Sequence, residues 1–318
     1  MARARVLALL LFATPLLGGS LFVSNERSGE ITVVDTATDR VVQRIKVGSQ
    51  PRGIHVSADG KTVLVALSDL TRDVRGGGDA IAVIADGRIV RRLDGGTDPE
   101  QFALSPDGRF LYAANEDAGT ATIMDLATGK PVATLVVGIE PEGVAISPDG
   151  RWVYVTAETS NTVSVIDTRV RRVVATFLVD ARPRAAAFSP DGRWAWVTSE
   201  IGGSISIVDV STHTVDDVID LPPPAKPVGI VISHDGKTAY VANGHGNSIT
   251  IVDTKKRAVV GTIGVGKRPW NLALTPDGRK LYVANGVSDD VSVIDPRTRK
   301  VVATIHVGGG PWGLAFAP

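Results

Sequence analysis

A strand ending in the pattern V-x-V-[I/V]-D recurs along the chain, and this repeat restricts the possible folds more than any other feature. Its final aspartate stands at Asp35, Asp125, Asp167, Asp209, Asp253 and Asp295. From Asp125 onward the spacings are 42, 42, 44 and 42 residues, and Ala80–Gly87 is a degraded copy in the longer gap before it. Repeats of about 40–45 residues predict a β-propeller or a similar array.

Four strands fit each repeat unit. In the unit that begins at Pro141 we expect them at Gly143–Pro148, Trp152–Ala157, Thr162–Asp167 and Arg172–Val179. Side chains alternate with a period of two, and Pro-Asp-Gly supplies a tight turn after the first strand. Four antiparallel strands in each repeat form the blade of a propeller.

The number of units predicts seven blades. Six units begin at a proline: Pro51, Pro99, Pro141, Pro183, Pro227 and Pro269. The segment Leu21–Thr36 lacks a first strand, and Pro311–Pro318 supplies one. Because an open row of sheets leaves exposed edges, both termini are expected to build one shared blade. The prediction is an all-β, seven-bladed propeller of four-stranded antiparallel blades, in a single domain over residues 21–318.

The first twenty residues have the pattern of a signal peptide. Arg3 and Arg5 precede the uncharged segment Val6–Leu17, and small residues follow up to Ser20. The apolar segment is too short to cross a bilayer. We therefore expect cleavage after residue 20, a periplasmic or secreted protein, and no membrane span afterwards. The alternative is a buried N-terminal helix.

Composition excludes several classes of site. The 318 residues include 34 basic and 34 acidic side chains, so the chain is formally neutral and nucleic acid is not an expected partner. Cysteine is absent, which excludes disulfides, thiolate metal sites, covalent c-type haem and a cysteine nucleophile. The expectation is a monomer with no cofactor and no metal ion.

The residue after the first proline of each unit, the x position, differs from blade to blade. Around the ring these residues are Arg52, Glu100, Glu142, Arg184, Val228, Trp270 and Trp312. We place them in the loop from strand four to strand one. Trp270 and Trp312 lie on adjacent blades, and as exposed indoles facing the Arg/Glu arc they suit a ligand or a partner protein. The alternative is that each tryptophan plugs its own blade junction.

The residue after strand two gives a second ring, expected on the same face. It contains Glu26, Ser68, Glu116, Glu158, Glu200, Gly244 and Gly286. The consecutive Glu116, Glu158 and Glu200 could bind a cation or the guanidinium of a partner, or they could be solvated rim charges. His245 lies on this face too, and the long loop Ser68–Asp79 is either a flap over it or a tolerated insertion.

The sequences LYVAN, VYVTA and AYVAN, each followed by a strand such as TVSVID, resemble the YVTN-type β-propeller repeat. A signal peptide followed by seven such repeats is most similar to the β-propeller proteins associated with pyrroloquinoline-quinone-dependent catabolism. That resemblance implies a periplasmic partner protein in an alcohol oxidation or transport system. It transfers no functional residue to this chain and does not imply that the chain binds the quinone.

Two classes of function follow. The first is a non-catalytic binding or scaffold protein, and the second is a hydrolase similar to the seven-bladed lactonases. No Ser-His-Asp order, metal triad or carboxylate pair emerges from the repeat register, and no catalytic residue is assigned. The sequence therefore favours the binding protein and leaves enzyme activity open.

Overall fold

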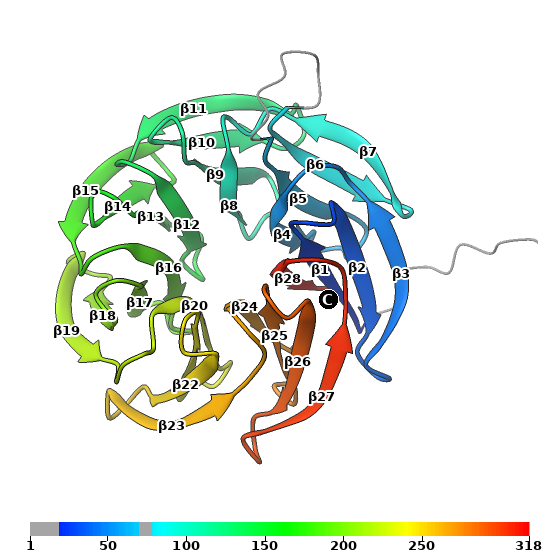
Figure 1. Cartoon of the computed structure of the whole chain (residues 1–318). Coiled ribbons are helices and arrows are strands. Elements are labelled where there is room, and N and C mark those ends of the chain that lie inside the picture. The colour runs from blue at the N-terminus through cyan, green and yellow to red at the C-terminus, as the bar shows by residue number, and fades with distance from the viewer. Residues whose placement is uncertain (1–18, 70–77, 318) are drawn as a thin grey trace, which may run out of the picture.

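The alternating apolar residues of the repeat form four-stranded antiparallel sheets, arranged as a closed ring around a central axis (Figure 1). The structure is a computed structural model that describes residues 19–69 and 78–317. The seven-bladed propeller predicted from the sequence is confirmed. Most of the predicted signal peptide, in residues 1–18, lies outside the described residues. In the part of the chain that is described, no helix has the length and apolar character to cross a membrane.

Each blade runs from an inner strand at the ring axis to an outer strand at the rim. In that order the blades are β28 (Pro311–Phe316), β1 (Ser20–Asn25), β2 (Glu30–Asp35) and β3 (Arg40–Lys46); β4 (Pro51–Val56), β5 (Val63–Leu67), β6 (Ala80–Ala85) and β7 (Arg88–Leu93); β8 (Pro99–Leu104), β9 (Phe110–Asn115), β10 (Thr120–Asp125) and β11 (Lys130–Val136); β12 (Pro141–Ile146), β13 (Trp152–Ala157), β14 (Thr162–Asp167) and β15 (Arg172–Leu178); β16 (Pro183–Phe188), β17 (Trp194–Ser199), β18 (Ser204–Asp209) and β19 (Thr214–Asp220); β20 (Pro227–Ile232), β21 (Thr238–Asn243), β22 (Ser248–Asp253) and β23 (Ala258–Gly264); and β24 (Pro269–Leu274), β25 (Leu281–Asn285), β26 (Asp290–Asp295) and β27 (Lys300–His306).

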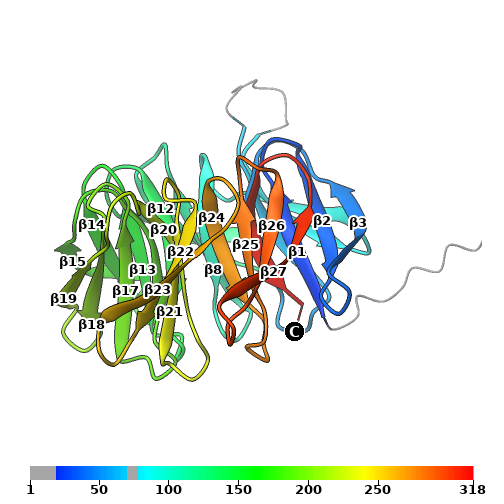
Figure 2. The ribbon, with the colours of Figure 1, turned by 60° about the horizontal axis from the view of Figure 1, so that its bottom comes forward.

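The two ends of the described chain meet in one blade, as predicted. Strand β28 pairs antiparallel with β1, with Leu21 opposite Phe316 and Val23 opposite Leu314. The amide of Ala317 donates to the carbonyl of Ser20 over 2.9 Å. Figure 2 shows the end of β28 beside the other strands of this blade. The pairing closes the ring and leaves no open sheet edge at the seam.

The aspartates of the repeat are turn residues, as expected. In the first turn of one blade, Asp149 accepts from the hydroxyl of Ser147 over 2.5 Å and from the amide of Arg151 over 3.0 Å. After strand three, Asp167 accepts from the amide of Arg169 over 2.9 Å. The hydroxyl bond of Ser147 is the largest influence that lowers the pKa of Asp149. These carboxylates therefore hold the turns.

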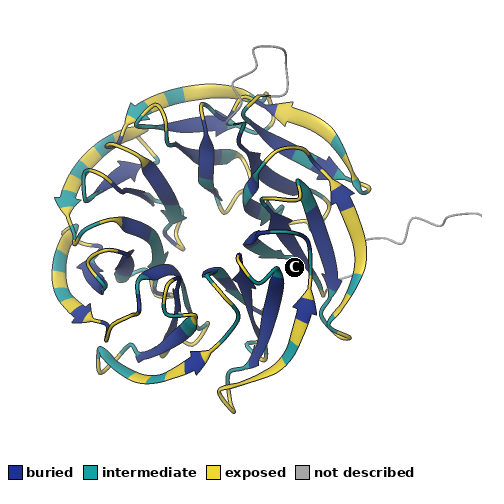
Figure 3. Ribbon diagram, in the orientation of Figure 1, coloured by how far each residue is buried: buried dark blue, intermediate teal, exposed yellow. Residues whose placement is uncertain are grey.

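The core lies between blades, where the middle strands are buried, while the outer strands consist mostly of exposed and intermediate residues (Figure 3). The fourth residue from the end of strand two projects toward the following blade. In six blades it is aromatic: Phe22, Tyr112, Tyr154, Trp196, Tyr240 and Tyr282. Tyr154, for example, packs against Phe188 of the next blade with ring centroids 4.9 Å apart. In the blade β4–β7 this position is Leu64, which packs against the blade β8–β11.

Candidate binding face

A β-bulge at the start of the inner strand takes the x residue out of the regular strand pairing. Pro141 pairs with Ala157 and Val144 with Val155, so two residues, Glu142 and Gly143, lie opposite one. The x residue therefore belongs to the strand and not to the preceding loop, and β12 begins two residues before the predicted start. A bulge redirects a side chain without ending the sheet, so the identity of this residue is not fixed by the pairing.

In four blades glycine follows the x position, at Gly53, Gly143, Gly229 and Gly313, and there the neighbouring blade comes very close. A Cβ atom on Gly143 would lie 2.2 Å from the carbonyl oxygen of Arg184 on the next inner strand. The inner strands can therefore pack tightly around the axis, which brings the x side chains of successive blades together.

The residues of the two predicted rings lie on one face and form ion pairs with one another. Arg52, from the first ring, donates through Nε to Glu26, from the second, over 2.9 Å. Arg184 likewise lies 2.6 Å from Glu142 and contacts Glu158 of the second ring. The sequence treats these as two separate rings, whereas the structure joins them into ion-pair clusters.

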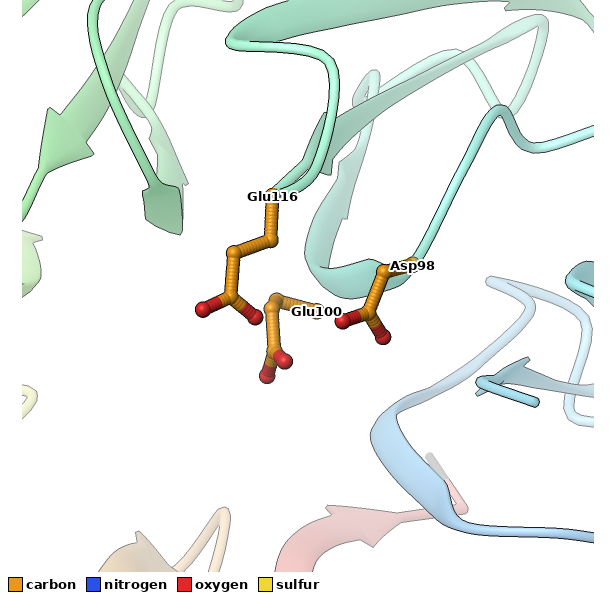
Figure 4. A group of neighbouring side chains, drawn as sticks. All are labelled: Asp98, Glu100 and Glu116. Atoms are coloured by element: carbon orange, nitrogen blue, oxygen red, sulfur yellow. The ribbon is translucent and has the colours of Figure 1, made fainter. Parts of the chain in front are cut away.

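The first cluster, here called the Arg52 cluster, consists of Arg52, Glu26, Asp98, Glu100 and Glu116. Arg52 Nη1 contacts Glu100 and lies 3.4 Å from Asp98 and 3.8 Å from Glu116. Figure 4 shows the last three side chains reaching from the β8–β9 blade toward the central axis. Burial of Arg52 by itself lowers its pKa, but the carboxylates of Glu26 and Asp98 outweigh this effect and raise it. The guanidinium therefore stays charged.

Carboxylate oxygens of Asp98, Glu100 and Glu116 lie within 4.8 Å of one another, a spacing that can hold a metal ion. The guanidinium of Arg52 already lies among them. A metal ion at this point would have to displace a buried positive charge. The donor set thus fits an organic cation at its outer edge better than a metal ion at its centre.

The second cluster, here called the Arg184 cluster, contains three guanidiniums and three carboxylates: Arg182, Arg184, Arg268, Glu142, Glu158 and Glu200. Arg182 Nε lies 2.6 Å from Glu158, and Arg268 Nη2 lies 3.0 Å from Glu200. Arg184 is only 7% exposed. Glu158 and Glu200 are also buried, and both are paired with guanidiniums of this chain. They are therefore not solvated rim charges, and they are not vacant sites for a partner's guanidinium.

Among the described residues, negative charge is in excess at the Arg52 cluster and not at the Arg184 cluster. When all groups are ionised, the Arg52 cluster carries four carboxylates against one guanidinium, a formal charge of −3, while the Arg184 cluster is neutral. Burial, followed by the charges of Asp98 and Glu142, raises the pKa of Glu116 to about 7. Glu116 therefore sits where a further positive charge would be most strongly stabilised.

The two tryptophans do not form an exposed platform. Trp312 is only 5% exposed, so the prediction of a surface indole was wrong there. Trp270 is half-buried, with the guanidiniums of Arg268 and Arg184 over its ring at 4.2 and 5.2 Å. A Cβ atom on Gly286 would lie 2.6 Å from its Cδ1, so glycine makes room for the indole. Trp270 thus supports the Arg184 cluster by cation–π packing.

His245 lies at the edge of this face. Its side chain is 65% exposed, and Nε2 is 4.0 Å from Glu200. Of the predicted flap Ser68–Asp79, residues 70–77 lie outside the described residues. Asp79 at its end accepts from the amides of Asp69 and Asp98 over 2.8 and 2.9 Å, which ties this segment to the Arg52 cluster.

Sequence reasoning missed Asp98, Arg182 and Arg268. All three directly precede the first proline of a unit. When the units are aligned at this proline, the residues before it form a third ring: Gln50, Asp98, Glu140, Arg182, Lys226, Arg268 and Gly310. Every member has a positive φ, between 40° and 70°. Left-handed backbone is unfavourable for residues other than glycine, and such residues concentrate at functional sites.

Comparison with known proteins places these features in a familiar fold. A family model described as "Lactonase, 7-bladed beta-propeller" matches residues 179–307, and one described as "Cytochrome D1 heme domain" matches residues 83–187. Curated protein sequences give no significant match.

Solved structures agree along nearly the whole chain. Hydrazine synthase from Kuenenia stuttgartiensis has 22% identity and a TM-score of 0.78, covering 92% of this chain and 99% of that one. A protein from Lactobacillus plantarum has 18% identity and a TM-score of 0.80, covering 95% and 100%. A candidate 6-phosphogluconolactonase from Bacteroides uniformis has 20% identity and a TM-score of 0.77, covering 93% and 98%. At these identities the likeness establishes the fold alone.

Proposed function

We propose that this chain is a non-catalytic binding propeller whose Arg52 cluster receives a cationic group, either an amine or guanidinium of a small ligand or a basic side chain of a partner protein. The excess of three carboxylates around Arg52 is the observation that carries the proposal. An incoming cation would relieve the repulsion among the described carboxylates that Arg52 leaves uncompensated.

The proposed setting is the periplasm, with a protein of a quinone-dependent alcohol oxidation or transport system as the partner. This part rests on the leader-like N-terminus and on the resemblance of the repeats to that group of propellers. Fractionation of the native host followed by N-terminal sequencing tests it, since a cytoplasmic protein that still begins at Met1 would contradict it.

A lactonase-like hydrolase is the second candidate, favoured by the match of residues 179–307 to the lactonase model. A sugar-phosphate lactone is an anion, and the guanidiniums of both clusters are already paired with carboxylates. Such a substrate would meet net negative charge at the Arg52 cluster. Hydrolysis of 6-phosphogluconolactone above the rate of a buffer blank would support this candidate against the binding protein.

The binding proposal is tested with a fluorescent tetra-arginine peptide as the probe. We expect saturable binding at low salt that weakens as ionic strength rises, because the contact is electrostatic. Affinity should increase between pH 6 and pH 8, since Glu116 gains its charge as the pH passes its pKa of about 7. The double variant Asp98→Asn/Glu116→Gln should bind at least tenfold more weakly.

The matched control is Asp216→Asn/Asp220→Asn, which removes two charges from the outer strand β19 and should leave the affinity unchanged. Equal loss in both variants would mean that only net charge matters and would overturn the site. Tighter binding of Ca²⁺ than of the peptide would show a metal site in place of an organic-cation site.

A further inference from the structure

At the junction between the blades β4–β7 and β8–β11, strand two does not supply the aromatic side chain that it supplies at the other junctions. At the fourth residue from the end of strand two it has Leu64, where the other six blades have phenylalanine, tyrosine or tryptophan. Phe102, on the facing inner strand β8, fills part of the space that a larger side chain at position 64 would occupy. Tyr154 and Tyr282 illustrate the contact that Leu64 cannot make, because their hydroxyls hydrogen-bond to His213 and Asp39 of the following blade.

A cavity of about 540 Å³ lies at this junction, here called the Leu64 pocket. Cavities at two other junctions, one beside Trp196 and one beside Phe316, measure about 300 and 420 Å³. The size of the Leu64 pocket is within the range of small-molecule sites. The pocket opens at the turn between strands one and two, on the face opposite the Arg52 cluster.

The lining of the pocket is apolar in its interior and basic at one point. Its apolar walls include Leu64, Val83, Leu93, Leu104 and Leu126. Among the described residues no acidic side chain lines it, whereas the guanidinium of Arg91 does and donates to the carbonyl of Leu126 over 3.1 Å. A pocket with this lining accepts an apolar body and favours a negatively charged substituent.

His55 forms the inner wall, between the Leu64 pocket and the central channel. Its ring packs against that of Phe102 with centroids 4.8 Å apart. Burial lowers the pKa of His55 to about 4, so the imidazole is uncharged at neutral pH. Among the described residues that line the pocket, Arg91 is thus the one that carries a positive charge.

We propose that the Leu64 pocket binds a small aromatic carboxylate, with its ring in the space left by the missing aromatic side chain and its carboxylate on Arg91. An apolar cavity of only about 150 Å³ in another protein holds benzene, so a ring fits the volume here. This site is separate from the proposed cation site, and neither depends on the other.

The test compares benzoate with its neutral analogue benzyl alcohol by isothermal titration and by saturation-transfer NMR. The wild-type chain should bind benzoate more tightly. Leu64→Tyr, which introduces the residue found at this position in four of the other blades, should abolish binding of both probes while the protein remains folded. Leu64→Phe, which copies Phe22, provides a second filling variant in case tyrosine is not accommodated.

Arg91→Ala should weaken benzoate at least tenfold and leave benzyl alcohol unaffected, whereas Arg88→Ala on the same strand should change neither. The double variant Asp98→Asn/Glu116→Gln should bind benzoate like the wild type. Failure of the wild type to bind either probe, or undiminished binding by a folded Leu64→Tyr protein, would overturn the proposal. Equal affinity for both probes would overturn the carboxylate assignment.

Discussion

Removing residues 311–318 is expected to abolish cooperative folding. The deletion takes away the inner strand β28, which buries Trp312, packs Leu314 and Phe316 into a junction, and covers the edge of β1. Loss of one buried Phe or Trp side chain costs about 3–5 kcal/mol, and the whole fold of a typical domain is stable by only about 5–15 kcal/mol. Circular dichroism should show no sharp melting transition, and size-exclusion chromatography should show aggregates.

A circular permutant is the matched control for this deletion. Because Ala317 and Ser20 are adjacent, residues 311–317 can be moved in front of Ser20 through a Ser-Pro-Asp-Gly turn like those of the other blades. The permutant has the same strands in one continuous blade and should melt close to the wild type. A truncated protein that melts like the wild type would show that the ring does not need β28.

Replacing Arg184 with methionine should cause the largest loss of stability expected from a single substitution on the binding face. The change leaves Glu142, Glu158 and Glu200 buried with two guanidiniums in place of three. Removing one partner of a buried ion pair costs about 3–5 kcal/mol, because the remaining charge is uncompensated. At pH 7.5 we expect a fall in Tm on the order of 5–10 °C.

The pH dependence of this loss identifies its cause. Burial already raises the pKa of Glu142, against the charge of Arg184, which lowers it. Without Arg184 the carboxyl is protonated more easily, so acidification to pH 5 neutralises part of the uncompensated charge and the difference in Tm should shrink. Arg297→Met, at a side chain that is 89% exposed, should leave Tm unchanged at both pH values. A pH-independent loss would indicate lost packing and not lost charge.

The repeat pattern predicted most of the fold because the side-chain period and the turn residues are local properties. Strands β13 and β14 have the predicted bounds, and closure through β28 and β1 is confirmed. The early start of β12 was missed because a proline at a strand's first position still pairs with its neighbour, here Ala157. No local pattern shows that a bulge follows it.

The sequence predicted that the ring residues, among them Arg52, Glu116, Glu142 and Arg184, lie on one face. It did not predict which of them contact one another. Register fixes which face a residue occupies, whereas the pairing of Arg184 with Glu158 depends on how closely neighbouring inner strands approach. The sequence left the burial of Trp312 in a blade junction as an alternative to exposure for the same reason, since depth comes from the adjoining blades. Whether this face binds a ligand stays a prediction.

The carboxyl ¹³C NMR titration of Glu116, with and without the tetra-arginine peptide, tests the central claim most directly. Glu116 is 31% exposed at its side chain and so is within reach of a ligand. In the free protein we expect it to titrate near pH 7, and the bound peptide should lower its pKa by favouring the charged form. Titration near the ordinary value of 4.5 in the free protein, or a pKa that saturating peptide leaves unchanged, would contradict a cation site at the Arg52 cluster.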